Sequence, residues 1–230
     1  LGVEVTYYDP LIGAAIKDLI KPNTKVVFTE SPGPQTFEVQ DIPAIAKAAH
    51  EAGAVVVLDN TWATPLFFKS FAHGADVSIQ AATKYIVGHA DAMLGAITAS
   101  KAVWPAIART HEELGLCVGP EDAYLGLRGL RSLGVRLARH QASAIALAEW
   151  LKNRPEVARV IHPALPSDPG HAIWKRDFTG SSGLFAIVLK PAPKKAVAAM
   201  LDGLELFGMG YSWGGFESLM IPFDPSTYRT

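Results

Sequence analysis

The sequence is poor in cysteine, in unbalanced charge and in long apolar runs. Its single cysteine, Cys117, cannot form an internal disulfide, which favours a reducing compartment. Its 21 basic and 22 acidic residues nearly cancel, so the composition gives no reason to expect a nucleic-acid partner. Its longest aliphatic stretches, such as residues 54–58 and 184–189, are far shorter than the roughly 20 residues that span a bilayer. We therefore expect a cytoplasmic protein with no membrane partner.

Apolar residues are abundant. They make up 49% of the 230 residues against 19% charged residues, which is ample material for a packed core. The length suits one large domain, or one domain with part of a second. The chain begins at Leu1 rather than at a methionine, so we expect a piece of a longer protein.

The first half alternates short β-branched runs with helical stretches. Uniformly apolar residues at 54–58 predict a strand that is buried on both faces, as in a parallel sheet. Asp41 is a candidate N-cap, with Pro43 in the first turn of a helix that runs to about Glu51. Further strands are predicted at 3–7, 25–29, 75–79 and 93–99, and a helix at 11–20. This alternation predicts an α/β fold with right-handed crossovers and a mostly parallel, doubly wound sheet.

The middle of the chain is helical. Residues 120–153 are rich in Leu, Ala and Arg at helical spacing, although glycines inside the pattern argue against one unbroken helix. We interpret the arginines there as a solvated or subunit-facing surface. Strands at 157–161, 184–189 and 204–207 predict a smaller α+β unit. We place the domain boundary near residue 132, giving a large domain at 1–132 and a small domain at 133–230, both incomplete.

Two polar groups follow neighbouring strands of the predicted sheet. Asp59 follows the strand at 54–58, and Thr83-Lys84 follows the strand at 75–79 after a short connection. Ligands bind beyond the carboxyl ends of parallel strands, so this acid and this amine are expected to face one crevice. Each has an ordinary alternative, because an Asp there is most often a cap and a lone loop Lys is most often solvated.

Together the two groups suit a pyridoxal phosphate site. A partly dehydrated lysine has a lowered pKa and condenses with an aldehyde. A buried carboxylate keeps the cofactor's ring nitrogen protonated, and the Thr83 hydroxyl is placed to reach the cofactor phosphate. Asp and Lys at this spacing are not rare, so the pair alone is a moderate signal.

Longer strings carry a family resemblance. They are LDNTWATPLFFK, VSIQAATKYIVGHADAM, RGLRSLGVRL, WKRDFTGSSGLF and YSWGGFESL, in this order. The series resembles the Cys/Met-metabolism family of pyridoxal-phosphate enzymes, which share the aspartate-aminotransferase-like fold. Residues Trp62, Ala81, Ala90 and Trp213 stand where the γ-lyases and γ-synthases of the family differ, and they favour its β-lyase branch.

The resemblance assigns roles to matching positions. Lys84 would hold the cofactor aldehyde and then shuttle protons, while Asp59 would pair with the ring nitrogen and Thr83 would help to hold the phosphate. The segment Tyr211-Ser212-Trp213 would lie near the substrate, with Ser212 orienting the lysine or the substrate and Trp213 shaping the pocket.

The activity that the resemblance implies is α,β-elimination of cystathionine to homocysteine, pyruvate and ammonia, in methionine biosynthesis. Relatives are homotetramers whose active sites borrow residues from a partner subunit, so association is expected. The alternatives are a γ-lyase or γ-synthase of the same family, and a truncated remnant without catalysis.

The sequence departs from the family pattern at several points. Ala81 stands where many relatives supply a phosphate-binding serine, and Pro34 where γ-family members place an asparagine. The family's glycine-containing phosphate loop and its ring-stacking aromatic residue would precede Leu1. The arginine that binds the substrate carboxylate would follow Thr230. These departures are what keep the remnant alternative open.

Other catalytic classes have little support. The G-x-S-x-G match at 210–214 has no histidine after it, as a hydrolase of that order requires. The seven histidines are scattered without a metal-binding spacing, so no metal site is predicted. Cys117 has no supporting pattern and is interpreted as a small apolar residue.

Overall fold

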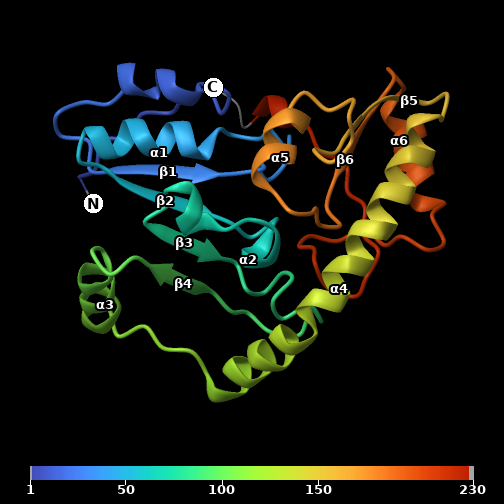
Figure 1. Ribbon diagram of the computed structural model, residues 1–230. Helices are drawn as coiled ribbons and strands as arrows, with labels where there is room; N and C mark the ends of the chain where they lie inside the picture. The colour runs from blue at the N-terminus through green and yellow to red at the C-terminus, as the bar shows by residue number, and fades with distance from the viewer. Residues whose placement is uncertain (1, 228–230) are drawn as a thin grey trace.

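The computed structural model describes residues 2–227 and is organised around a four-stranded sheet in the order β1-β2-β3-β4 (Figure 1). The strands are β1 (Val26–Glu30), β2 (Val55–Asp59), β3 (Val77–Gln80) and β4 (Ala96–Ala99). β1, β2 and β3 are parallel, and β4 runs antiparallel to β3. The predicted α/β class with a mostly parallel sheet is therefore confirmed.

A second, two-stranded sheet lies in the C-terminal half. It pairs β5 (Val157–Ile161) with β6 (Ala186–Leu189) in antiparallel orientation. The helices are α1 (Ile42–Glu51), α2 (Thr64–Phe67), α3 (Trp104–Glu113), α4 (Pro120–Lys152), α5 (His171–Asp177) and α6 (Lys194–Asp202), with 3₁₀ turns η1 (Gly13–Asp18), η2 (Ser70–His73) and η3 (Pro225–Thr227). In the described part of the chain, no helix is both long and apolar enough to cross a membrane.

Helix α1 forms as the sequence predicts and covers one face of the large sheet. The Asp41 carboxylate caps it by accepting a hydrogen bond from the backbone N–H of Ala44 at 3.1 Å. Its buried side chains, among them Ile45 and Ala49, pack against Val27 of β1 and Val56 of β2. Since side chains alternate along a strand, Glu30 and Asp59 at the strand ends lie on the opposite face.

Three predicted elements are wrong or altered. Residues 3–7 form no strand: the side chains of Val3 and Val5 are 74% and 65% exposed, and no neighbouring strand pairs with them. The helix predicted at 11–20 is the shorter 3₁₀ turn η1, and Gly13 at its start has φ 52°, outside the α region. The strand predicted at 204–207 is absent, and only a single bridge between Gly208 and Leu219 forms nearby.

Helix α4 is unbroken despite its glycines and runs from below the β4 edge of the large sheet to the second sheet (Figure 1). Gly129 explains why a glycine is needed: a Cβ there would lie 2.1 Å from the carbonyl oxygen of Ile86. The missing side chain lets α4 pack directly on the backbone that follows β3. Residue 132, near which we expect the domain boundary, lies within this helix, and the boundary itself stays a prediction.

The C-terminal half packs onto the ends of the large sheet. Phe178, at the end of α5, belongs to the core cluster that holds Leu58 of β2 and Trp62, and the Trp62 indole N–H donates to the Leu184 carbonyl at 2.9 Å. These contacts join segments more than a hundred residues apart in sequence, and they place the C-terminal half beside the strand ends.

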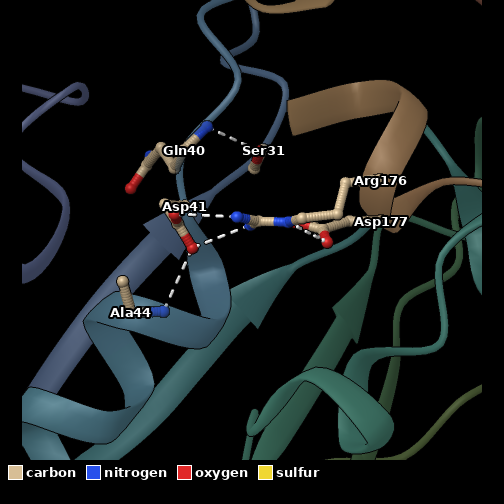
Figure 2. Close-up of polar contacts among 6 residues, drawn as sticks. All are labelled: Ser31, Gln40, Asp41, Ala44, Arg176 and Asp177. Atoms are coloured by element: carbon tan, nitrogen blue, oxygen red, sulfur yellow. Dashed lines mark hydrogen bonds and ion pairs between the residues drawn. The ribbon is translucent and has the colours of Figure 1, made fainter. Parts of the chain in front are cut away.

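An ion-pair cluster makes a second connection between the halves (Figure 2). The Arg176 guanidinium on α5 donates to both carboxylate oxygens of Asp41 at 2.9 and 3.1 Å, and to both of Asp177 at 2.7 Å. This hydrogen bonding holds the pKa of Asp41 below its usual value and raises that of Arg176. The N-cap of α1 is thereby tied to α5.

Candidate functional site

The amine of Lys84 lies in the loop that follows β3, where the sequence predicts it. Its Nζ donates a hydrogen bond to the Ser212 hydroxyl at 2.7 Å and lies 5.5 Å from the centre of the Trp213 ring. Partial burial lowers the pKa of the Lys84 amine, because desolvation disfavours its charged form. The structure therefore brings together Lys84, Ser212 and Trp213, three of the predicted site residues.

The segment that carries Ser212 runs directly against the lysine loop. Ser212 has a left-handed backbone with φ 75°, and Gly214 follows with φ 83°. A Cβ on Gly214 would lie 2.9 Å from the backbone nitrogen of Tyr85 and 3.0 Å from the carbonyl carbon of Lys84. Only a glycine allows this approach. Tyr211, in contrast, is 90% exposed, and its catalytic role stays a prediction.

Thr83 and Ala81 shape the loop around the lysine. The Thr83 hydroxyl accepts from the Leu94 N–H at 2.8 Å and donates to the Leu94 carbonyl at 3.2 Å. The Ala81 carbonyl accepts from the Lys84 backbone N–H at 2.9 Å. A hydroxyl has one proton to donate. To donate it to a phosphate, Thr83 must therefore break its 3.2 Å hydrogen bond to the Leu94 carbonyl.

Asp59 ends β2, one strand away from the lysine loop. It lies opposite Ile79 of β3 in the parallel register. Its Oδ1 accepts from the Thr61 hydroxyl at 2.5 Å and from the Thr61 N–H at 2.9 Å. Within residues 2–227, its Oδ2 accepts no hydrogen bond. That oxygen is therefore available to an N–H donor at the carboxyl end of the sheet.

A second carboxyl group stands beside Asp59. Glu30 ends β1 and pairs with Asp59 in the register of the two strands, so both lie on the same face. Burial, and then the charge of Asp59, raise the pKa of Glu30 to about 7. Near neutral pH, Glu30 is thus partly protonated.

The sequence did not point to Tyr85, which anchors the lysine loop. Tyr85 is buried, its hydroxyl accepts from the backbone N–H groups of Gly183 and Leu184 at 2.9 and 3.1 Å, and burial raises its pKa to about 12. Its ring lies 5.2 Å from those of Trp213 and His140. The one sequence feature that could have indicated Tyr85 is its position directly after the predicted site residue Lys84.

The interpretation of the helix arginines as a solvated or subunit-facing surface is wrong for Arg136. Its guanidinium turns inward and donates to the carbonyls of Tyr85, Ile86 and Gly129 at 2.8, 3.2 and 2.8 Å. These carbonyls come together only when the chain folds. The pattern of charges along the helix therefore could not reveal the role of Arg136.

The residues present suit pyridoxal phosphate. An amine with a lowered pKa, an aromatic ring beside it and a carboxylate with one open oxygen are the groups that an aromatic aldehyde with a ring nitrogen requires. Of the phosphate contacts, the structure offers Thr83 alone among the predicted residues, since the Ala81 N–H donates to Thr61.

Comparison with known proteins decides the family. Residues 1–229 match the family described as Cys/Met metabolism PLP-dependent enzyme. The chain belongs to this family. The predicted fold is likewise confirmed by the crystal structure of a cystathionine γ-synthase from Xanthomonas oryzae pv. oryzae in complex with cystathionine. That structure superimposes with a TM-score of 0.82 at 38% identity, covering 85% of this chain and 50% of that one.

Two relatives are markedly more similar in sequence. A putative cystathionine β-lyase of Rhizobium johnstonii is 56% identical over 225 residues, which are 96% of this chain and 57% of that protein. Cystathionine β-lyase MetC of Escherichia coli K12 is 51% identical over 228 residues, covering 98% of this chain and 58% of that protein. The chain thus spans somewhat more than half the length of these relatives.

Proposed function

We propose that this chain is the larger part of a pyridoxal-phosphate-dependent carbon–sulfur lyase that cleaves L,L-cystathionine by α,β-elimination. The products are homocysteine, pyruvate and ammonia. The observation that carries the proposal is the contact of the Lys84 amine with Ser212, at the carboxyl end of the sheet that also presents Asp59. The names of the relatives reported above favour β-elimination over the γ-reactions.

The bound cofactor supplies an aldehyde that holds the substrate amine and a ring that withdraws electrons. Lys84, its pKa lowered by desolvation, takes the substrate α-proton on its Nζ. Ser212 orients that amine through its hydroxyl. Asp59 would hold a proton at the ring nitrogen through its Oδ2, the oxygen that Thr61 leaves open. The bond between the substrate's β-carbon and sulfur would then break, and the sulfur would leave as homocysteine with the proton that Lys84 had taken. Water would release the remaining three carbons as pyruvate together with ammonia.

Further parts of the proposal come from the family. A role in methionine biosynthesis, a cytoplasmic location and a homotetramer follow from the resemblance. Exposed apolar side chains on α4, among them Leu127, Leu130 and Val135, support association with another subunit, because such residues are costly to leave in water.

The experiment is product analysis with purified protein, pyridoxal phosphate and cystathionine. The proposal predicts pyruvate, and loss of all product in Lys84→Ala. Release of 2-oxobutyrate instead would show γ-elimination. Failure of the protein to bind the cofactor would support the remnant without catalysis.

A further inference from the structure

The hydroxyl of Thr61 joins the two strand ends that carry the site. It donates to Asp59 Oδ1 at 2.5 Å, and it accepts from the backbone N–H of Ala81 at 2.8 Å. The N–H of Thr61 donates to the same Asp59 oxygen at 2.9 Å. Residue Thr61 is 5% exposed, so water does not compete freely for these bonds.

The direction of these hydrogen bonds is fixed by the groups involved. A backbone N–H only donates, so the Ala81 amide occupies a lone pair of the Thr61 oxygen and leaves the Thr61 proton for the carboxylate. Asp59 Oδ1 thereby receives two donors. These two bonds set the rotation of the carboxylate and leave Oδ2 as the oxygen that could accept a bond from a ring nitrogen.

The same hydroxyl also connects the acid to the backbone of the lysine loop. Ala81, whose N–H bonds to Thr61, accepts the backbone N–H of Lys84 at its carbonyl. Asp59 and the Lys84 loop are therefore held relative to each other through one side chain. Thr83, the threonine that the sequence singles out, makes no such connection, since its hydroxyl is bonded to Leu94.

We propose that Thr61 is a positioning residue, which fixes the Asp59 carboxylate for the cofactor's ring nitrogen and sets its distance from the lysine loop. This inference rests on the proposed function, since it concerns how the same site holds pyridoxal phosphate. It assigns to Thr61 an effect on cofactor affinity that acts through Asp59.

The test measures the dissociation constant of pyridoxal phosphate for Thr61→Val, which removes the hydroxyl at nearly constant volume. Affinity should fall about tenfold, as the loss of a hydrogen bond to a charged group implies. Thr61→Ser, which keeps the hydroxyl, should stay within about twofold of the wild type. Thr29→Val is the matched control, because Thr29 is 1% exposed in the same sheet and donates only to the Val57 carbonyl.

A double-mutant cycle with Asp59→Asn separates positioning from general stability. If Thr61 acts through Asp59, adding Thr61→Val to Asp59→Asn should change the affinity by less than about twofold. Thr61→Ala replaces Thr61→Val in the cycle if the latter does not fold. Equal losses in Thr61→Val and Thr29→Val, or additive losses in the cycle, would overturn the inference while the proposed function stands. A wild-type protein that binds no cofactor would overturn both.

Discussion

The Nζ of Lys84 lies 2.7 Å from the Oγ of Ser212, although the two residues are 128 positions apart in the sequence. The contact exists because Gly214 lets the chain pass directly over the backbone of Lys84 and Tyr85. We expect a hydroxyl held in this way to orient the amine for proton transfer.

Removing the Ser212 hydroxyl should slow proton transfer. In Ser212→Ala the Lys84 amine loses its side-chain partner, so kcat for pyruvate release should fall about tenfold with little change in KM. Ser218 is an exposed serine of the same segment, and Ser218→Ala should leave kcat unchanged. Equal kinetics for the two variants would show that Ser212 does not orient the lysine.

Substituting alanine for either of two glycines in α4 should change the stability of the protein in opposite directions. Gly129→Ala places a Cβ against the Ile86 carbonyl, so the free energy of unfolding should fall by about 3 kcal/mol. Gly134→Ala meets no atom within 4 Å and gains helix propensity, so stability should rise by up to about 1 kcal/mol. Urea denaturation measures both. A Gly129→Ala variant as stable as the wild type would contradict the close packing of α4 on the lysine loop.

Arg136 should stabilise the loop after Lys84. Arg136→Met leaves the carbonyls of Tyr85, Ile86 and Gly129 without their donor, and should cost about 2 kcal/mol of unfolding free energy. Arg139→Met, on the exposed side of the same helix, should change stability by less than about 0.5 kcal/mol. Denaturant titration of both variants is the measurement, and equal effects would rule out the inward role of Arg136.

The pKa of Glu30 makes stability depend on pH. Glu30 ionises near pH 4.5 when exposed and near pH 7 in the folded chain, so between these values the folded state holds a proton that the unfolded state has lost. The contribution of Glu30 to the free energy of unfolding therefore falls as pH rises from 4.5 to 7, and it is constant above pH 7. The stability of Glu30→Gln relative to the wild type should therefore increase across that window. Denaturation at several pH values tests this, with exposed Glu112→Gln as the control. A difference that does not vary with pH would contradict the shift.

Local patterns predicted much of the fold. Strand β2 and helix α1 form where the sequence predicts them. Their signals, the apolar run at 54–58 and the cap and proline at Asp41-x-Pro43, involve only residues that are close together in the sequence. Residues 3–7 show the limit of this approach, because β-branched residues form a strand only when another strand pairs with them. Gly126 and Gly129 argued against a continuous helix, whereas packing against the loop after β3 requires Gly129.

Some site residues could likewise be predicted from local sequence patterns, and others could not. Asp59 and Lys84 could be found because each follows a predicted strand, and the strand ends of a parallel sheet share an edge. Ser212 and Trp213 came from the family resemblance, since no spacing rule connects residues so far apart. The connections made by Thr61 and Arg136 depend on backbone groups that meet only after folding, so no local pattern marks them.

Locating the bound cofactor tests whether Lys84 is the lysine that holds pyridoxal phosphate. The protein is incubated with pyridoxal phosphate, reduced with borohydride to fix any lysine-bound cofactor, and mapped by peptide mass spectrometry. We expect the label on Lys84, its loss in Lys84→Ala and its retention in the control Lys101→Ala. A label on another lysine, or none on the wild type, would contradict it.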